Sequence, residues 1–223
     1  MKMPYIMGLR ADVWSQSSSD ERQEALQELE NYFAMEEGRE PAQVSSVDMP
    51  SSALGKHYFD DKGVDNIELN SNLIQGTTPY ESVETLCHES RHSYQHHIVE
   101  NPELATSQEQ VADWQKSQGG GYIQPNEINY STYRWQSTEV DANTIARERT
   151  DQLYQETFQD TEQYPDYKAK QEQLLSDDIE YAKYELGENY VEEANKAVSD
   201  KYESKQAEAL GESEGYDYGY GYY

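Results

Sequence analysis

Residues 78–100 read TPYESVETLCHESRHSYQHHIVE. Thr78 and Glu81 have the spacing of a capping box, and Pro79 stands at the first helical position, where its missing N–H costs nothing. Apolar residues then recur at helical spacing and predict one buried stripe, formed by Val83, Leu86, Cys87, Tyr94 and Ile98. The stretch therefore predicts one amphipathic helix, around which the rest of the fold is arranged.

Two histidines lie one turn apart on the flank of this stripe, in the sequence HESRH. His88 and His92 can bind one metal ion together, and Glu89 projects from the next position without taking a ligand place. Zinc lowers the pKa of a bound water to about 7, and a glutamate beside it can take the proton as the water attacks a carbonyl. The motif predicts a Zn²⁺ site with Glu89 as the general base.

A catalytic zinc needs a third protein ligand and a place for water. His96 lies eight residues from His88, a rise of about 12 Å along a helix, which is too far for one ion. A carboxylate is the better candidate, from a helix predicted to begin near residue 137. We favour Glu139 as the ligand, Asp141 as the group that orients it or caps the helix, and Asn143 as a support. The choice between Glu139 and Asp141 stays open.

HESRH followed by EVDANTIA, residues 139–146, resembles the paired motifs of ImmA/IrrE-type peptidases, which belong to the gluzincin-like zinc metallopeptidases. The chain is also similar to small bacterial and phage zincin domains, some of them attached to toxin-like proteins. The resemblance covers roughly residues 18–149 in element order, and only the two motifs are specific. It implies His88, His92 and Glu139 as zinc ligands, Glu89 as general base, and hydrolysis of a peptide bond in a peptide or protein substrate.

A site of this type often has one more donor for the oxyanion of the tetrahedral intermediate. Tyr130, Tyr133 and Arg134 stand just before the helix that carries Glu139, and they are the candidates for that role.

The remaining elements predict an α+β fold, a mostly helical zincin-like domain with a small N-terminal sheet. A helix over residues 18–37 has a Ser18–Glu21 capping box and ends at Gly38. A short strand falls within residues 42–49, and residues 54–60 and 64–70 form a hairpin. We expect residues 64–70 to offer a free edge to an extended peptide. The three glycines at 119–121 predict a flexible joint, and residues 122–135 predict an irregular loop.

Composition divides the chain further. Residues 1–155 form the expected zincin-like domain, residues 156–210 a helical acidic extension, and residues 211–223 a disordered Gly/Tyr-rich tail. Cys87 is expected in the core, and His57, His96 and His97 are expected as structural or solvated residues. Arg91 lies between the two histidines; we expect it to form a surface salt bridge, and the alternative is a pair with an acidic residue beside the metal site.

The 17 basic and 44 acidic residues give a net charge of −27, which argues against binding to nucleic acid or anionic lipid. No apolar run has transmembrane length, and the N-terminus lacks a signal-peptide pattern, so we expect a cytoplasmic protein or one exported without a classical signal. The alternative function is a non-enzymatic acidic interaction protein with a structural or vestigial metal site, whose C-terminal region binds a basic protein. A helical protein without a metal would leave the succession of the two motifs unexplained.

Overall fold

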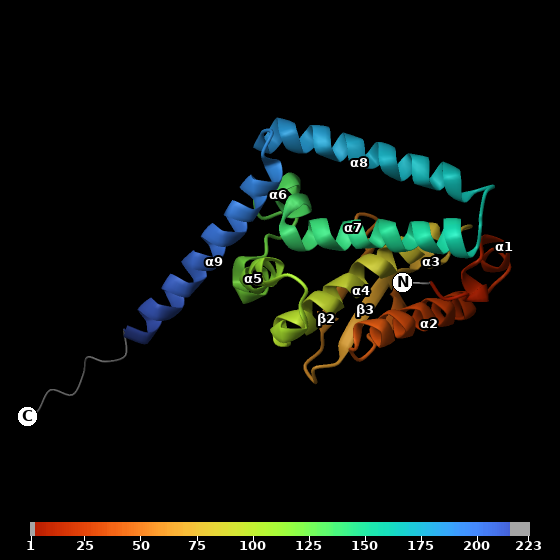
Figure 1. The fold of residues 1–223 in the computed structure, drawn as a ribbon, viewed down its shortest axis with the longest axis horizontal. Helices are drawn as coiled ribbons and strands as arrows, with labels where there is room; N and C mark the ends of the chain where they lie inside the picture. Colours follow the sequence, from red (N-terminus) through yellow and green to blue (C-terminus); the bar gives the residue numbers. More distant parts are fainter. Residues whose placement is uncertain (1–2, 215–223) are drawn as a thin grey trace, which may run out of the picture. The chain divides into compact units, whose positions relative to one another are not determined.

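The computed structural model describes residues 3–214 and consists mostly of helices with one small mixed sheet, in agreement with the α+β class (Figure 1). Of the predicted tail, residues 211–214 belong to the last helix, and residues 215–223 lie outside the described part. The elements are η1 (Met7–Leu9), α1 (Ala11–Trp14), α2 (Ser19–Glu37), β1 (Gln43–Val47), β2 (Gly55–Phe59), β3 (Asp65–Asn70), α3 (Ser71–Ile74), α4 (Tyr80–Glu100), η2 (Pro102–Leu104), α5 (Gln108–Lys116), η3 (Ser117–Gly121), α6 (Tyr130–Trp135), α7 (Ser137–Asp151), η4 (Gln152–Thr157), α8 (Tyr164–Leu186) and α9 (Tyr190–Glu214).

The chain divides into two compact units. The first comprises the described residues up to Asn101 and Asp141–Asp177, and the second comprises Pro102–Val140 and the described residues from Asp178 onward. One boundary between the units therefore follows α4, and the other two fall inside α7 and α8. The division at residues 155 and 210, which composition suggested, stays a prediction.

Helix α2 begins and ends as its sequence predicts. The Ser18 side chain accepts a hydrogen bond from the Glu21 N–H at 3.3 Å, and the Glu21 carboxylate accepts one from the Ser18 N–H at 2.7 Å. Gly38 has φ of 68°, the left-handed conformation that a glycine adopts without steric cost at a helix end. The inner face of α2 buries Leu26 and Leu29 completely.

The predicted hairpin is present, but its second strand has no free edge. The strand order is β1-β3-β2, with β3 parallel to β1 and antiparallel to β2. Val44 of β1 pairs with Ile67 of β3, and the Gln27 side chain accepts the Val44 N–H at 2.7 Å, which fixes β1 against α2. The prediction that residues 64–70 form an edge was wrong, because the weakly patterned segment around Val44 pairs with them. The edges of this sheet are β1 and β2.

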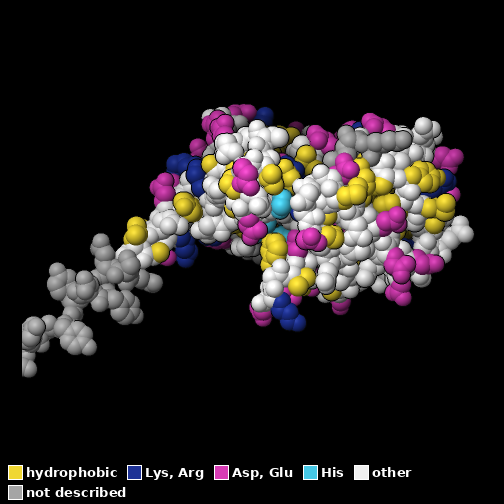
Figure 2. Space-filling view, turned by 60° about the horizontal axis from the view of Figure 1, so that its bottom comes forward, with side chains coloured by type: hydrophobic (Ala, Val, Ile, Leu, Met, Phe, Trp, Pro, Cys, Tyr) yellow, Lys and Arg dark blue, Asp and Glu magenta, His cyan; other side chains and the backbone are white. Residues whose placement is uncertain are grey.

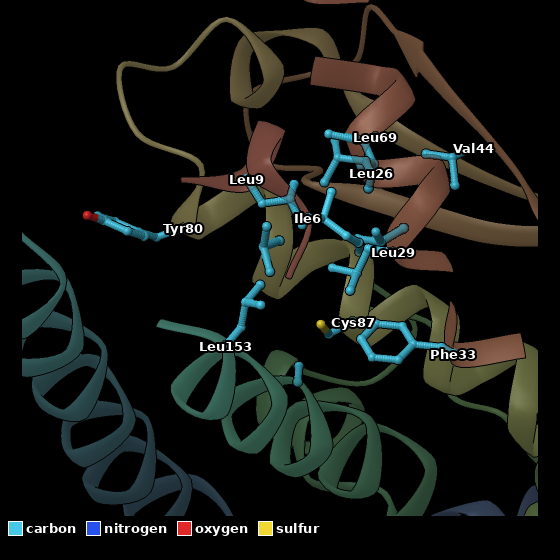
Figure 3. Close-up of a cluster of buried hydrophobic side chains, with 14 of the residues drawn as sticks. Ile6, Leu9, Leu26, Leu29, Phe33, Val44, Leu69, Tyr80, Cys87 and Leu153 are labelled. Atoms are coloured by element: carbon cyan, nitrogen blue, oxygen red, sulfur yellow. The ribbon is translucent and has the colours of Figure 1, made fainter. Parts of the chain in front are cut away.

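One face of the sheet packs on helices and forms the core of the first unit (Figure 3). Ile67 and Leu69 are fully buried on this face, where β3 packs on α4 and β1 packs on α2. Cys87 of α4 is also fully buried there, and burial raises the pKa of its thiol to about 12. The expectation that Cys87 is a small core residue and not a reactive thiol is therefore confirmed.

In the second unit, α9 packs against α5, α6 and the turn η3. A Cβ on Gly119 would lie 2.7 Å from the Tyr202 ring, and one on Gly121 would lie 2.6 Å from the Val198 carbonyl oxygen. The glycines are thus needed for the close approach of α9. The prediction of a flexible joint was wrong. Glycines lack side chains, and at these positions that property allows α9 to pack closely.

None of the helices within residues 3–214 is long and apolar enough to cross a membrane. Acidic side chains are spread over the face seen in Figure 2, whereas lysine and arginine occur there at fewer points. A histidine side chain is also visible on this face.

Candidate metal centre

Helix α4 carries the HESRH motif, but it does not begin with the predicted capping box. Pro79 precedes the first helical residue with φ of −82° and ψ of −12°, and no side-chain hydrogen bond caps the helix. The preceding loop is instead held from another helix, since the Arg22 guanidinium donates to the Gly76 carbonyl at 3.0 Å. The prediction from Thr78 and Glu81 was wrong because long-range hydrogen bonds, which no local pattern reveals, position this loop.

The two histidines of the motif face one another. The Nε2 atoms of His88 and His92 lie 3.1 Å apart, and both side chains are half-buried. Each of these histidines and Glu139 offers a ligand atom, and the three atoms lie within 4.8 Å of one another. Two nitrogens at about 2.05 Å from one tetrahedral zinc ion would be about 3.3 Å apart. Two imidazoles and a carboxylate are ligands that zinc takes, the two imidazole nitrogens have the spacing of zinc ligands, and the Glu139 carboxylate lies within 4.8 Å of them.

Asp141, the other carboxylate considered as a ligand, already has three hydrogen bonds. Arg91 of α4 donates to both of its oxygens, from Nε at 2.7 Å and from Nη2 at 3.0 Å, and Gln95 donates to Oδ2 at 2.8 Å. These contacts hold α7 on α4 just after its first turn, and Glu139 lies two residues earlier on the same helix. The Arg91 pair is a bidentate, largely buried contact, so the expectation of a surface salt bridge was wrong, and the alternative of a pair with a nearby acidic residue describes the contact.

Gln95 connects this ion pair to the metal site, a role that no sequence motif indicated. Its Oε1 lies 2.9 Å from Nδ1 of His92, and its amide nitrogen donates to Asp141. The signal that was available is spacing, because Gln95 follows Arg91 by four residues and His92 by three and so shares their helix face.

Glu139 also has a hydrogen-bond partner in Tyr122, a residue that the sequence predicted only as part of a loop. The Tyr122 hydroxyl donates to Oε1 of Glu139 at 2.6 Å, and burial and the nearby carboxylate raise the pKa of this phenol. The neighbouring residue is held firmly, since the Ile123 N–H and carbonyl both bond the Gln136 side chain, at 3.1 and 2.9 Å. Tyr122 is therefore positioned to hold the Glu139 carboxylate.

Glu89 is buried and points toward strand β2, with 7% of its surface exposed. A Cβ added to Gly55 would lie 3.1 Å from its Oε1, so the carboxylate rests against the backbone of an edge strand. The general-base candidate thus lies against strand β2.

The three predicted oxyanion donors lie on α6, a helix where the sequence predicted a loop. Its N-terminus is capped by Asn129, whose side chain accepts the Thr132 N–H at 2.7 Å. Tyr130 is about half exposed, and Arg134 forms an ion pair with Asp178 at 3.3 Å.

Tyr133 is half-buried, with its ring 6.2 Å from that of Tyr122, and Asn143 is half-buried on α7. The roles suggested for these residues stay predictions.

The other histidines of α4 and the sheet do not join the metal group. His57 Nε2 lies 2.7 Å from Asp65 Oδ1, which agrees with the expected structural role. His96 packs on the rings of His57 and Phe59, and burial, with a contribution from His57, lowers the pKa of His96 to about 4. The expectation that His96 is solvated was wrong, because strand β2 covers it.

Comparisons with protein-family models, with curated proteins and with solved structures find no match to this chain.

Proposed function

We propose that this protein is a zinc-dependent metallopeptidase of the gluzincin type, with His88, His92 and Glu139 as ligands and Glu89 as general base. The observation that carries the proposal is the grouping of the three ligand atoms within 4.8 Å, two from α4 and one from α7. Glu89 directly follows the first histidine and is not part of this group, so it is free to act as the general base of a catalytic centre.

When bound, zinc would polarise the scissile carbonyl and lower the pKa of a water molecule to about 7. The chain's own residues do the rest. Glu89 accepts the proton of the attacking water and returns it to the leaving amine, a role suited to a carboxylate that is shielded from solvent and held against Gly55. Tyr122 and Asp141 keep the surrounding side chains in place.

We assign substrate binding to strand β2 in place of the segment first expected. Among the described residues β2 pairs only with β3, so its other edge can accept an extended peptide as a further strand. Gly55 of this strand contacts Glu89, so a peptide added along this edge would run beside the general base. Backbone pairing would hold a peptide with little dependence on its side chains.

The test compares two glutamate variants of the same helix. Glu89→Gln should abolish cleavage of a peptide library, read by mass spectrometry, while zinc content stays at the wild-type level. Glu81→Gln, at an exposed position of α4, should cleave like the wild type. Cleavage retained in Glu89→Gln would contradict the mechanism. A zinc-loaded wild type that cleaves no peptide would favour the interaction protein with a structural metal.

A further inference from the structure

The side chains of Arg91, Asp141, Gln95 and His92 form one hydrogen-bonded chain that ends at the metal site. We propose that Gln95 and Asp141 are positioning residues that set the affinity for zinc. They do so by fixing the protonated nitrogen of His92 and by holding the start of α7, which carries Glu139. The inference rests on the proposed zinc site, and it goes beyond the orienting role expected for Asp141 by naming Gln95 as the link between Asp141 and His92.

Which atom donates in each of these hydrogen bonds follows from the chemistry of the groups. An ionised carboxylate only accepts hydrogen bonds, so Asp141 requires Gln95 to turn its amide N–H toward it, at 2.8 Å. The Gln95 oxygen is then the atom that faces His92 Nδ1, at 2.9 Å, and it can only accept. Nδ1 of His92 must therefore carry the proton, which leaves the lone pair on Nε2, the atom that faces His88 at 3.1 Å. Zinc binds this neutral form.

The Gln95 amide suits both neighbours, because its oxygen accepts from His92 and its nitrogen donates to Asp141. A glutamate at position 95 could accept from His92 but would place a second carboxylate beside Asp141, where the two charges repel. These hydrogen-bonded side chains are also shielded from water, since Gln95 is 2% exposed and the Arg91 and Asp141 side chains are 13% and 11% exposed. Hydrogen bonds in such surroundings are stronger than at the surface.

The same hydrogen bonds also help to position Glu139, the third ligand. Arg91 and Gln95 lie on α4, as the two histidines do, and both bond Asp141 on α7. Glu139 precedes Asp141 by two residues on that helix, so the contacts that orient His92 also fix the helix turn from which Glu139 projects. Loss of the link at Gln95 should therefore affect two of the three ligands.

The test uses ¹⁵N NMR of the metal-free protein to read which His92 nitrogen is protonated, and chelator competition to measure the zinc dissociation constant. The wild type should show His92 protonated at Nδ1. Gln95→Met, which removes both bonds, should lose this preference and bind zinc about 10- to 100-fold more weakly. Gln95→Glu should keep the proton on His92 Nδ1 but still bind zinc more weakly. This variant separates the orientation of His92 from the attachment of α7 through Asp141. Gln173→Met, at an exposed position of α8, is the control.

A wild-type His92 protonated at Nε2 would overturn the proposal, even if the variants fail to fold. Zinc affinity in Gln95→Met equal to that of the Gln173→Met control would also overturn it. If the wild type binds no zinc, the metal site and this inference fall together. If zinc binds as described but no peptide is cleaved, only the proposed peptidase activity fails.

Discussion

Gly55→Ala should lower turnover by moving the general base while leaving the zinc ligands untouched. The new Cβ would lie 2.9 Å from Cγ2 of Thr85, 3.1 Å from Oε1 of Glu89 and 3.2 Å from the Glu68 carbonyl oxygen. Thr85 cannot rotate away freely, because its hydroxyl donates to the Glu81 carbonyl at 2.8 Å. The added methyl group must therefore displace the Glu89 carboxylate or the strand itself.

The contacts set the size of the effect. Ordinary van der Waals contact begins near 3.4 Å, so the neighbours of residue 55 must move by a few tenths of an ångström. Overpacking of this kind costs roughly 1–3 kcal/mol of stability. A misplacement of 1 Å can cost about 100-fold in rate, so a shift of 0.3–0.5 Å corresponds to a fall in kcat of roughly 4- to 10-fold.

The assay measures kcat on a cleaved peptide together with zinc content and unfolding by urea. Gly63→Ala is the matched control, because Gly63 has φ of +77° and no atom within 4 Å of its would-be Cβ. It should lose about 1–2 kcal/mol through backbone strain alone and keep its kcat. Wild-type kcat in Gly55→Ala, or equal rates in the two variants, would refute the placement of Glu89 against β2.

Further predictions concern buried groups of both units. Glu30→Ala should cost about 1–3 kcal/mol in urea unfolding, because the buried Arg39 and the Ala42 N–H each lose a hydrogen-bond acceptor, while Glu37 still pairs with Arg39. Burial raises the pKa of Glu84, so its contribution to stability is fully present below about pH 4.5 and is lost as pH rises through the raised pKa. Unfolding of Glu84→Gln measured across this range should lack that decline, and an identical pH profile would contradict the assignment. Tyr122→Phe should weaken zinc binding by about 10-fold in chelator competition, through loss of its bond to Glu139, and unchanged affinity would exclude this support.

Local patterns predicted the elements whose causes are local. The Ser18–Glu21 capping box and the glycine at position 38 define α2, because each acts within one helix turn. The hairpin around Gly63 follows from a tight turn between two short strands. The half-buried His88 and His92 lie one turn apart because helix geometry alone fixes that spacing.

Features set by contacts between distant segments could not be predicted in this way. The central place of β3 depends on pairing with Val44, more than twenty residues earlier, whose own segment has little alternation. The start of α4 depends on Arg22 and its bond to Gly76. Gln95 and Tyr122 are polar residues without a motif, and their roles emerge only when α7 brings Asp141 and Glu139 to them.

Zinc content, measured by elemental mass spectrometry on protein purified without chelators, tests the central claim most directly. About one zinc per chain is expected for a three-ligand site. Glu139→Ala should lose it, whereas Asp141→Ala should retain a weaker site, because Asp141 bonds Arg91 and Gln95 and is not one of the three grouped ligands. A wild type that holds no zinc and takes up none when zinc is added would contradict the account.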